Sequence, residues 1–305
     1  MSSSAKKMIS REDFQDLCKA GRIAAQALEY GKKQVKKNET LLGVTEKVEE
    51  KISHLGGQLA FPVNMSCDTI AAHYAAAPND TTVLHEHVLK LDVGVNINGW
   101  IGDNAVTIDL SGQRSELVKA SREALNTVIK MLKPGTTLHE IGSTVEEIIT
   151  DMGFQPIRNL SGHEIGKYIV HTGISIPSYA SGEMTDIKEG MIIAVEPFAT
   201  MGKGVIKEQG TAEIFSIKDY KPVRVGFVRD IVAYCQQHFK FMPFSRRALL
   251  PKFSLSQISY AISTLKMNGM LREYPPLVEK GLVSQAEHSM IIEKDKARVL
   301  TTIED

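Results

Sequence analysis

The feature that most constrains the fold of this chain is an internal repeat. Residues 18–28, CKAGRIAAQAL, match residues 118–128, VKASREALNTV. The identical pairs are Lys19/Lys119, Ala20/Ala120, Arg22/Arg122 and Ala24/Ala124. Further along, Thr40 matches Thr137 and Gly56 matches Gly153, with the offset reduced to 97 residues. Each copy predicts a long amphipathic helix, a turn and a second helix that ends at glycine, so we expect a duplicated pair of αβ halves.

The two copies also carry comparable polar residues after the helices. His73 in the first copy aligns with His171 in the second, and we expect both histidines in matched loops. The strand LKLD ending at Asp92 aligns with IAVE ending at Glu196. Two halves related by a pseudo-twofold axis would bring both carboxylates to one central cleft, although four-residue apolar strands match easily by chance.

Residues 90–110, KLDVGVNINGWIGDNAVTIDL, read as a β-hairpin around the Asn-Gly dipeptide that begins at Asn98. That dipeptide is the strongest short-range signal for a two-residue turn. Counting outward from the turn puts Gly94 opposite Asp103, with Asp92 on the same face. Diagonal neighbours on one face lie about 7–8 Å apart, which is close enough for two carboxylates to share ions. Two solvated aspartates on an exposed face would explain this stretch equally well.

Composition and charge exclude several classes of protein. The chain has 305 residues, with 36 basic and 36 acidic side chains, a balance that gives no general argument for binding nucleic acid or membranes. Its three cysteines are far apart and form no CxxC pair, so a thiolate zinc site is not expected and a reducing cytosol suits the chain. Without an apolar run near 18 residues or a signal-peptide pattern, the chain is expected to be a soluble cytoplasmic protein.

The pattern changes between Lys218 and Tyr274. The runs FVRDIVAYCQQHF, SRRALLPKF and LSQISYAISTLKMNGM read as three helices, which predicts a small helical unit inserted between residues 1–217 and residues 275–305. Basic residues outnumber acidic ones in this stretch. An ordinary solvated face is the simpler explanation of that bias, and contact with nucleic acid is the alternative.

Further acidic and imidazole side chains complement the two aspartates of the hairpin. His163 follows a Ser-Gly turn, Glu196 ends a buried strand and Glu287 lies in a late strand. Each is ordinary alone, but with Asp92 and Asp103 they form an oxygen-rich set suited to two divalent ions. Carboxylates can hold two ions about 3.5–4 Å apart, with a shared water whose pKa falls toward neutrality, giving a hydroxide nucleophile. The set therefore predicts a metal-assisted hydrolase, for which Mn²⁺, Fe²⁺ or Co²⁺ would serve as well as Zn²⁺.

Several segments together resemble the type II methionine aminopeptidases, in particular their short archaeal form. They are AFPVNMSCDTIAAHY, RNLSGHEIGKY, VEPFATMGKG, EYPPL, QAEHSMII and the hairpin described above. The resemblance spans nearly the whole chain. It implies the α+β pita-bread fold, with two pseudo-symmetric αβ halves and a winged-helix-like insert at residues 218–274. It also implies removal of the initiator methionine from nascent chains when the second residue is small.

The resemblance assigns the metal ligands and the proton carrier. The ligands of two divalent ions would be Asp92, Asp103, His163, Glu196 and Glu287. Asp103 and Glu287 would bridge the two ions. Glu196 would also take a proton from the attacking water and return it to the leaving amine.

The resemblance further assigns the residues that contact the substrate. His73 would contact the scissile amide nitrogen, and His171 would contact the peptide carbonyl. The substrate-binding set would be Phe61, His73, Val170, His171 and Tyr274. In the same region, Asn64 and Ile214 stand where eukaryotic type II enzymes have glycine and histidine.

Two other functions stay open from the sequence. An Xaa-Pro peptidase shares the fold and the ligand set, but such enzymes usually carry a large N-terminal domain, and about 60 residues precede the first core strand here. A binding module that has lost its metal ligands is the second alternative, and the five intact ligand positions oppose it. We expect a monomer, and docking of the basic insert to the ribosome would be compatible with the enzyme.

Overall fold

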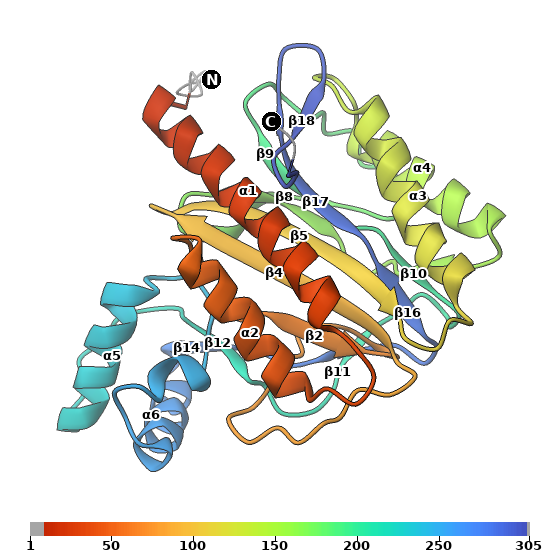
Figure 1. Cartoon of the computed structure of the whole chain (residues 1–305). Coiled ribbons are helices and arrows are strands. Elements are labelled where there is room, and N and C mark those ends of the chain that lie inside the picture. Colours follow the sequence, from red (N-terminus) through yellow and green to blue (C-terminus); the bar gives the residue numbers. More distant parts are fainter. Residues whose placement is uncertain (1–8, 304–305) are drawn as a thin grey trace.

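The computed structural model describes residues 9–303, and its helices follow the internal repeat. The first copy forms α1 (Arg11–Gln34) and α2 (Leu41–His54), and the second forms α3 (Ser115–Met131) and α4 (Leu138–Asp151). In Figure 1, α1 and α2 lie across the strands of the first half, while α3 and α4 lie together beside the second half.

The second helix of each copy begins and ends in the same way. The Thr40 hydroxyl accepts a hydrogen bond from the amide three residues later (3.2 Å), and Thr137 does the same at 3.1 Å. Threonine is a favoured first cap because its oxygen satisfies an amide that has no partner inside the helix. The chain then leaves each helix through a glycine with positive φ, 80° at Gly56 and 83° at Gly153, as helix ends often require. These matched features confirm the predicted duplication.

A nine-stranded antiparallel sheet forms the centre of the fold. Its main path runs β1-β4-β5-β17-β9-β7-β8, with β2 added to β4 and β18 added to β17. The strands are β1 (Gln58–Leu59), β2 (Asn64–Cys67), β4 (Val88–Ile97), β5 (Trp100–Asp109), β7 (Gly162–Gly166), β8 (Ile169–Ile176), β9 (Ile192–Val195), β17 (Glu287–Ile292) and β18 (Ala297–Val299). The late strand β17 therefore lies between the strands of the two halves (Figure 1).

Three small sheets of three strands each accompany the large one. The first consists of β11 (Lys207–Glu208), β15 (Leu277–Val278) and β3 (Ile70–Ala72). The second consists of β16 (Val283–Gln285), β10 (Phe198–Thr200) and β6 (Gln155–Pro156). The third consists of β13 (Phe244–Ser245), β12 (Ile214–Ile217) and β14 (Leu271–Tyr274).

The hairpin at the centre of the first half has the predicted register. Strands β4 and β5 pair with Gly94 opposite Asp103, while Asp92 faces Ala105, so the two aspartates are diagonal neighbours. The turn residue Asn98 has φ 50° and the following glycine has φ 93°. Positive φ at both central residues is the conformation that an Asn-Gly turn favours.

The apolar core is divided in the same way as the chain. One cluster joins α1 and α2 to β4, with Leu91 and Val48 fully buried, and another joins α3 and α4 to β9, with Leu125 and Ile193 fully buried. A third cluster, which contains Phe61 and Val170, includes residues of both halves. The packing therefore supports the two αβ halves and brings their edges together at the middle of the sheet.

Residues 218–274, the helical segment, contain two α-helices where three were predicted. The helices α5 (Gly226–His238) and α6 (Leu255–Met267) match the first and third runs. The middle run, residues 245–253, forms only a short 3₁₀ turn, η1 (Arg247–Leu249), directly after β13. Two features explain the difference: Pro251 has no amide hydrogen to bond the Arg247 carbonyl as an α-helix would, and Ser245 at the start of the run pairs with Ile214 of β12. A separate apolar cluster joins α5 and α6 and includes Phe215 of β12.

Within residues 9–303, none of the helices is both long enough and apolar enough to cross a membrane.

Candidate metal centre

Five neighbouring strands of the large sheet each bring one of the predicted ligands to the same cavity. Asp92 lies on β4, Asp103 on β5, Glu287 at the start of β17, Glu196 directly after β9 and His163 on β7. These strands are consecutive in the sheet. All five side chains line a cavity of about 240 Å³, so the fold brings together residues that span almost 200 positions of the sequence.

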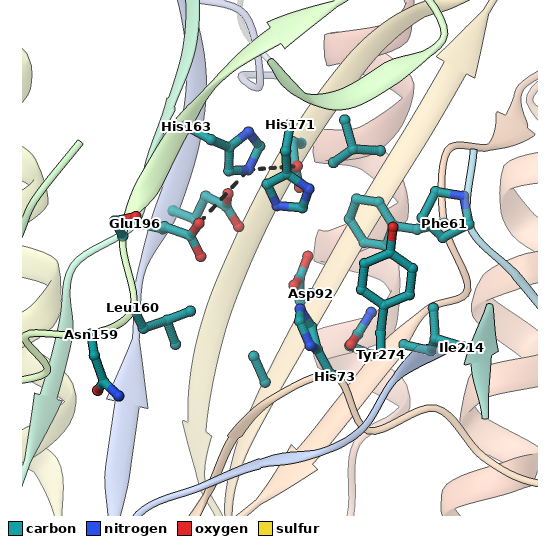
Figure 2. Close-up of a pocket in the computed structure, with 17 residues that line it drawn as sticks. Phe61, His73, Asp92, Asn159, Leu160, His163, His171, Glu196, Ile214 and Tyr274 are labelled. Atoms are coloured by element: carbon teal, nitrogen blue, oxygen red, sulfur yellow. Dashed lines mark ion pairs between the residues drawn. The ribbon is translucent and has the colours of Figure 1, made fainter. Parts of the chain in front are cut away.

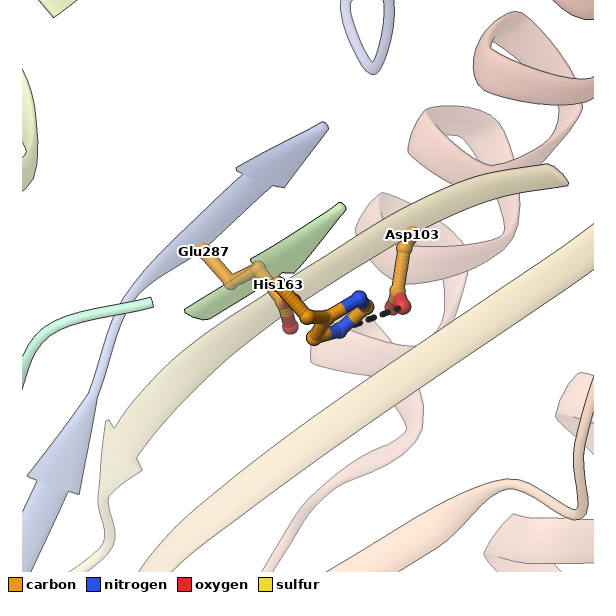
Figure 3. Close-up of side chains that lie close together, drawn as sticks. All are labelled: Asp103, His163 and Glu287. Atoms are coloured by element: carbon orange, nitrogen blue, oxygen red, sulfur yellow. Dashed lines mark ion pairs between the residues drawn. The ribbon is translucent and has the colours of Figure 1, made fainter. Parts of the chain in front are cut away.

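The closest group in this cavity surrounds His163. Its Nε2 is 3.8 Å from Asp103 Oδ2 and 3.7 Å from Glu196 Oε1. Asp103, His163 and Glu287 each offer one ligand atom, and these atoms lie within 4.8 Å of one another (Figure 3). Asp92 is outside this closest group but lies across the same cavity (Figure 2).

The buried carboxylates lack the partners that a protein interior normally supplies. Asp92 Oδ1, Asp103 Oδ1 and Glu287 Oε2 are buried and have no hydrogen-bond partner in the part of the chain that the structure describes. Such groups are costly unless a cation or a donor compensates them. Bound divalent cations would compensate them, since carboxylate oxygens are ligands for such ions.

The pKa values of the site also indicate that cations would compensate the buried carboxylates. Burial raises the pKa of Asp92 to about 7. Burial, and after it repulsion from the neighbouring carboxylates, raises the pKa of Asp103, Glu196 and Glu287 well above the ordinary value. Burial, followed by the nearby His171, lowers the pKa of His163, which keeps this imidazole in the neutral form that binds metal. The donor set therefore fits divalent metal ions.

The two predicted catalytic histidines face the same cavity from opposite sides (Figure 2). His73 follows β3, and burial, followed by the charge of His171, lowers its pKa to about 4. The ring of His171 lies 4.1 Å from the ring of His163. His171 lies within β8 and not in a loop as the sequence predicted, because the β7–β8 hairpin continues the pairing past its turn.

An apolar pocket adjoins the ligands. Figure 2 places Phe61, Tyr274 and Ile214 together on one side of the cavity, opposite His163 and Glu196. Val170 and Pro243 complete this wall, so the predicted residues Phe61, Val170 and Tyr274 do lie together. Gly94 makes the arrangement possible, because a side chain there would place its first carbon 2.2 Å from the Phe61 ring.

Two polar residues near the ligands were not assigned a role from the sequence. The Gln285 amide donates to Glu196 Oε2 (3.2 Å) and thereby orients this carboxylate. Asn64 is buried opposite Asp92 in the β2–β4 pair, and its amide donates to the Pro62 carbonyl (2.8 Å). The spacing of Gln285, two residues before Glu287, could have identified it as a residue of the site. Residues with this spacing lie on one side of an extended chain.

The chain matches known proteins over most of its length. The sequence profile of metallopeptidase family M24 matches residues 15–225. The chain belongs to this family. A methionine aminopeptidase from Archaeoglobus fulgidus is 41% identical over 288 residues, which are 93% of this chain and 97% of the relative. A methionine aminopeptidase from Pyrococcus abyssi is 40% identical over 293 residues, which are 95% of this chain and 99% of the relative.

A solved structure shows the same fold for this M24 chain. The crystal structure of the methionine aminopeptidase from Thermotoga maritima has a TM-score of 0.71 at 22% identity, covering 97% of this chain and 99% of that chain. The M24 chain therefore has the pita-bread fold. The archaeal relatives place it with the type II short form that the sequence motifs resemble. As a family of metallopeptidases, M24 also implies divalent metal cofactors.

Proposed function

We propose that this M24 chain is a metal-dependent aminopeptidase that removes the N-terminal methionine of nascent proteins when the second residue is small. The observation that carries the proposal is the cavity itself. Five consecutive strands present four carboxylates and one imidazole beside an apolar pocket. Relatives that match this chain over nearly its full length are methionine aminopeptidases.

We infer that Asp92, Asp103, His163, Glu196 and Glu287 would hold two divalent ions, with Asp103 and Glu287 bridging them. The central positions of β5 and β17 in the sheet support this assignment, since their neighbours on either side carry the other ligands. Divalent ions bound there would polarise the scissile carbonyl and lower the pKa of a water molecule toward neutrality. Mn²⁺, Fe²⁺, Co²⁺ and Zn²⁺ all suit the oxygen-rich set.

Three side chains would handle the substrate and its protons. Glu196, held by Gln285 and with its pKa raised by burial, would accept the proton of the attacking water and return it to the leaving amine. His73 would hold the scissile amide nitrogen. His171 would donate to the peptide carbonyl as negative charge develops on its oxygen.

The pocket would select methionine at the first position and a small residue at the second. Phe61, Val170 and Tyr274 supply an apolar wall for the thioether side chain, together with the edges of His73 and His171. The scissile carbonyl has to reach the ligand group while the methionine side chain fills this wall. A bulky second side chain would displace the carbonyl, and a shift of about 1 Å can cost about a hundredfold in rate.

The cellular context is also part of the proposal. We infer a monomer that works in the cytoplasm on chains emerging from the ribosome. We further infer that residues 1–217 and 275–305 form the catalytic domain and that residues 218–274 are an inserted subdomain able to dock to the ribosome. The separate apolar cluster of α5 and α6 supports the subdomain.

A peptide panel tests the function. The protein is stripped with EDTA, reloaded with Mn²⁺ or Co²⁺, and assayed on Met-Ala-Ser, Met-Lys-Ser, Leu-Ala-Ser and an Xaa-Pro dipeptide. We expect rapid release of methionine from Met-Ala-Ser, a smaller rate with leucine and almost none with lysine in the second position. Comparable cleavage of Met-Lys-Ser would indicate a broad aminopeptidase, and preference for the Xaa-Pro substrate would indicate the other peptidase of this fold.

A further inference from the structure

Arg247 connects the helical segment with two other parts of the molecule. Its Nη1 and Nη2 atoms donate to the two carboxylate oxygens of Glu49 on α2, each at 2.7 Å. Its Nε donates to the Ala76 carbonyl at 3.0 Å. The Arg247 and Glu49 side chains are only 9% and 18% exposed. A two-pronged pair of this kind fixes orientation as well as distance, so Arg247 holds α2, the backbone at Ala76 and the helical segment in one arrangement.

Ala76 lies three residues after His73, whose backbone is in an unusual conformation. The φ angle of His73 is 65°, in a left-handed region that non-glycine residues rarely adopt. Such a conformation persists only where the surrounding contacts enforce it. The Met65 amide donates to the Tyr74 carbonyl at 2.8 Å, and Arg247 donates to the Ala76 carbonyl two residues later. The chain immediately after His73 is therefore held at two points, and one of them is Arg247.

The ring of His73 also packs against the helical segment. Its centroid lies 5.7 Å from that of Tyr274, with the two rings nearly perpendicular at 85°. Tyr274 ends β14, and its hydroxyl lies 3.0 Å from the Ser216 hydroxyl on β12. His73 Nδ1 has no hydrogen-bond partner among the described residues. The position of the His73 ring therefore depends on its packing against Tyr274 and on a hydrogen bond with the backbone of the next residue, Pro275. A shift of the helical segment would change both contacts.

We propose that Arg247 is a positioning residue for His73. It holds the backbone after His73 in place, and it holds the segment that carries Tyr274 against α2. This inference rests on the proposed function, in which His73 contacts the scissile amide. The helical segment thereby contributes to catalysis, because it sets the position of a histidine that belongs to the first αβ half.

A double-mutant cycle tests this role. Arg247→Met keeps the apolar stem and removes the guanidinium. We expect it to lower kcat on Met-Ala-Ser by roughly a hundredfold, the cost of displacing a catalytic group by about 1 Å, with metal content unchanged. In a His73→Ala background the same substitution should lower kcat less than about twofold, because residues that act as a unit are not additive. An equal loss in both backgrounds would overturn the proposal.

The neighbouring arginine provides a matched control. Arg246 also forms an ion pair, with Glu213, but its contact does not involve the segment after His73. Arg246→Met should keep kcat within about twofold of the wild type. If Arg247→Met fails to fold, Arg247→Lys replaces it, since lysine keeps the charge but cannot form the fork. Its smaller loss of kcat should show the same dependence on His73, and a loss independent of His73 would contradict the proposal.

An activity-independent measurement separates this inference from the proposed function. Hydrogen–deuterium exchange of residues 73–77 should be at least severalfold faster in Arg247→Met and unchanged in Arg246→Met. Unchanged exchange in both variants would show that Arg247 does not hold this segment. If the wild type cleaves no methionyl peptide with any metal, the proposed function fails, while the exchange result still decides whether Arg247 fixes the backbone.

Discussion

The two halves of the molecule anchor their second helix in the same way. In the first half, the Leu41 amide at the start of α2 donates to the Thr82 carbonyl at 2.9 Å. In the second half, the Leu138 amide at the start of α4 donates to the Thr185 carbonyl at the same distance, 2.9 Å. Matching β-bridges, Thr40 with Val83 and Thr137 with Asp186, tie the two helix starts to the loops before β4 and β9. The two halves thus share a detailed backbone plan. Their contributions to the cavity differ, since the first half supplies two aspartates and the second supplies a histidine and a glutamate.

The paired histidines show how far the halves have diverged. His73 follows a short strand with a left-handed backbone and is packed against Tyr274. His171 lies in the long strand β8, exposed to solvent and next to His163. A duplicated backbone therefore placed strand ends around one cleft, while the side chains and local conformation at those ends specialised. Mutation, pH and metal binding can separate the properties that follow the shared plan from those that belong to one half.

The largest effect is expected for Asp103, the proposed bridging ligand of the first half. Asp103→Asn should remove activity and weaken the binding of both ions, because the amide lacks the charge that offsets two close cations. We expect a loss of metal affinity beyond the roughly 10–100-fold that follows loss of an outer-shell partner. Calorimetric titration checks this, with Asp109→Asn at the far end of β5 as control. Two undiminished metal sites in Asp103→Asn would rule out the assignment.

The two histidines should give the next largest effects and should differ from each other. His73→Ala and His171→Ala should both lower kcat, by about 10²–10³-fold, while metal content measured by mass spectrometry stays at the wild-type level. We expect the larger loss for His73, because water can partly replace the solvent-exposed His171. A variant that loses its metal would show that the histidine concerned is a ligand.

The metal-free protein should become more stable as the pH falls from 8.5 to 7. The pKa of Asp92 is raised to about 7 in the folded protein, and those of Asp103, Glu196 and Glu287 are raised as well. A raised carboxyl pKa gives stability that is complete below the unfolded value near 4 and is lost as pH rises through the folded value. Between pH 7 and 8.5 the buried Lys90, whose pKa burial lowers to about 7, acts in the opposite direction, but it is one group against four carboxylates. Below about pH 6.5 the buried histidines, with lowered pKa values, also act in the opposite direction.

Thermal melts with and without metal measure this dependence. The EDTA-treated protein should melt a few degrees higher at pH 7 than at pH 8.5. Saturating Mn²⁺ should stabilise the protein more at pH 8.5, because the ligands must be deprotonated to bind. A metal-free melting temperature that rises between pH 7 and pH 8.5 would mean that the four carboxylates are not buried together.

The smallest effects should come from the matched helix caps. Thr40→Ala and Thr137→Ala should each lower the free energy of unfolding by about 1 kcal/mol, as measured by urea titration. Thr137→Ala should cost slightly more, because the Thr137 hydroxyl also donates to the Glu140 carboxylate (2.8 Å) within a capping box. A loss at one cap only would show that the two helix starts are not equivalent.

The parts of the site that depend on short-range patterns could be predicted from the sequence. The Asn-Gly turn fixed the hairpin register, and with it the diagonal placement of Asp92 and Asp103. The threonine and glycine positions of the repeat marked the beginning and end of α2 and α4. These features follow from local conformational preferences that a few neighbouring residues decide.

Contacts between distant segments could not be predicted in this way. The hydrogen bond from Gln285 to Glu196 joins residues 89 positions apart, and that from Arg247 to Glu49 joins residues 198 positions apart. Both depend on how whole strands and helices pack. The prediction of a middle helix in the helical segment was wrong for one local reason and one distant one. Pro251 lacks an amide hydrogen, and β13 at the start of the run pairs with β12.

The central claim is that five strands, two from each half with β17 between them, hold two metal ions in one cavity. Crystals grown with Mn²⁺ and measured at the manganese absorption edge test it directly, because anomalous scattering locates the metal without reference to activity. We predict two peaks about 3.5–4 Å apart among Asp92, Asp103, His163, Glu196 and Glu287. A single peak elsewhere, or none in this cavity at saturating Mn²⁺, would contradict the account.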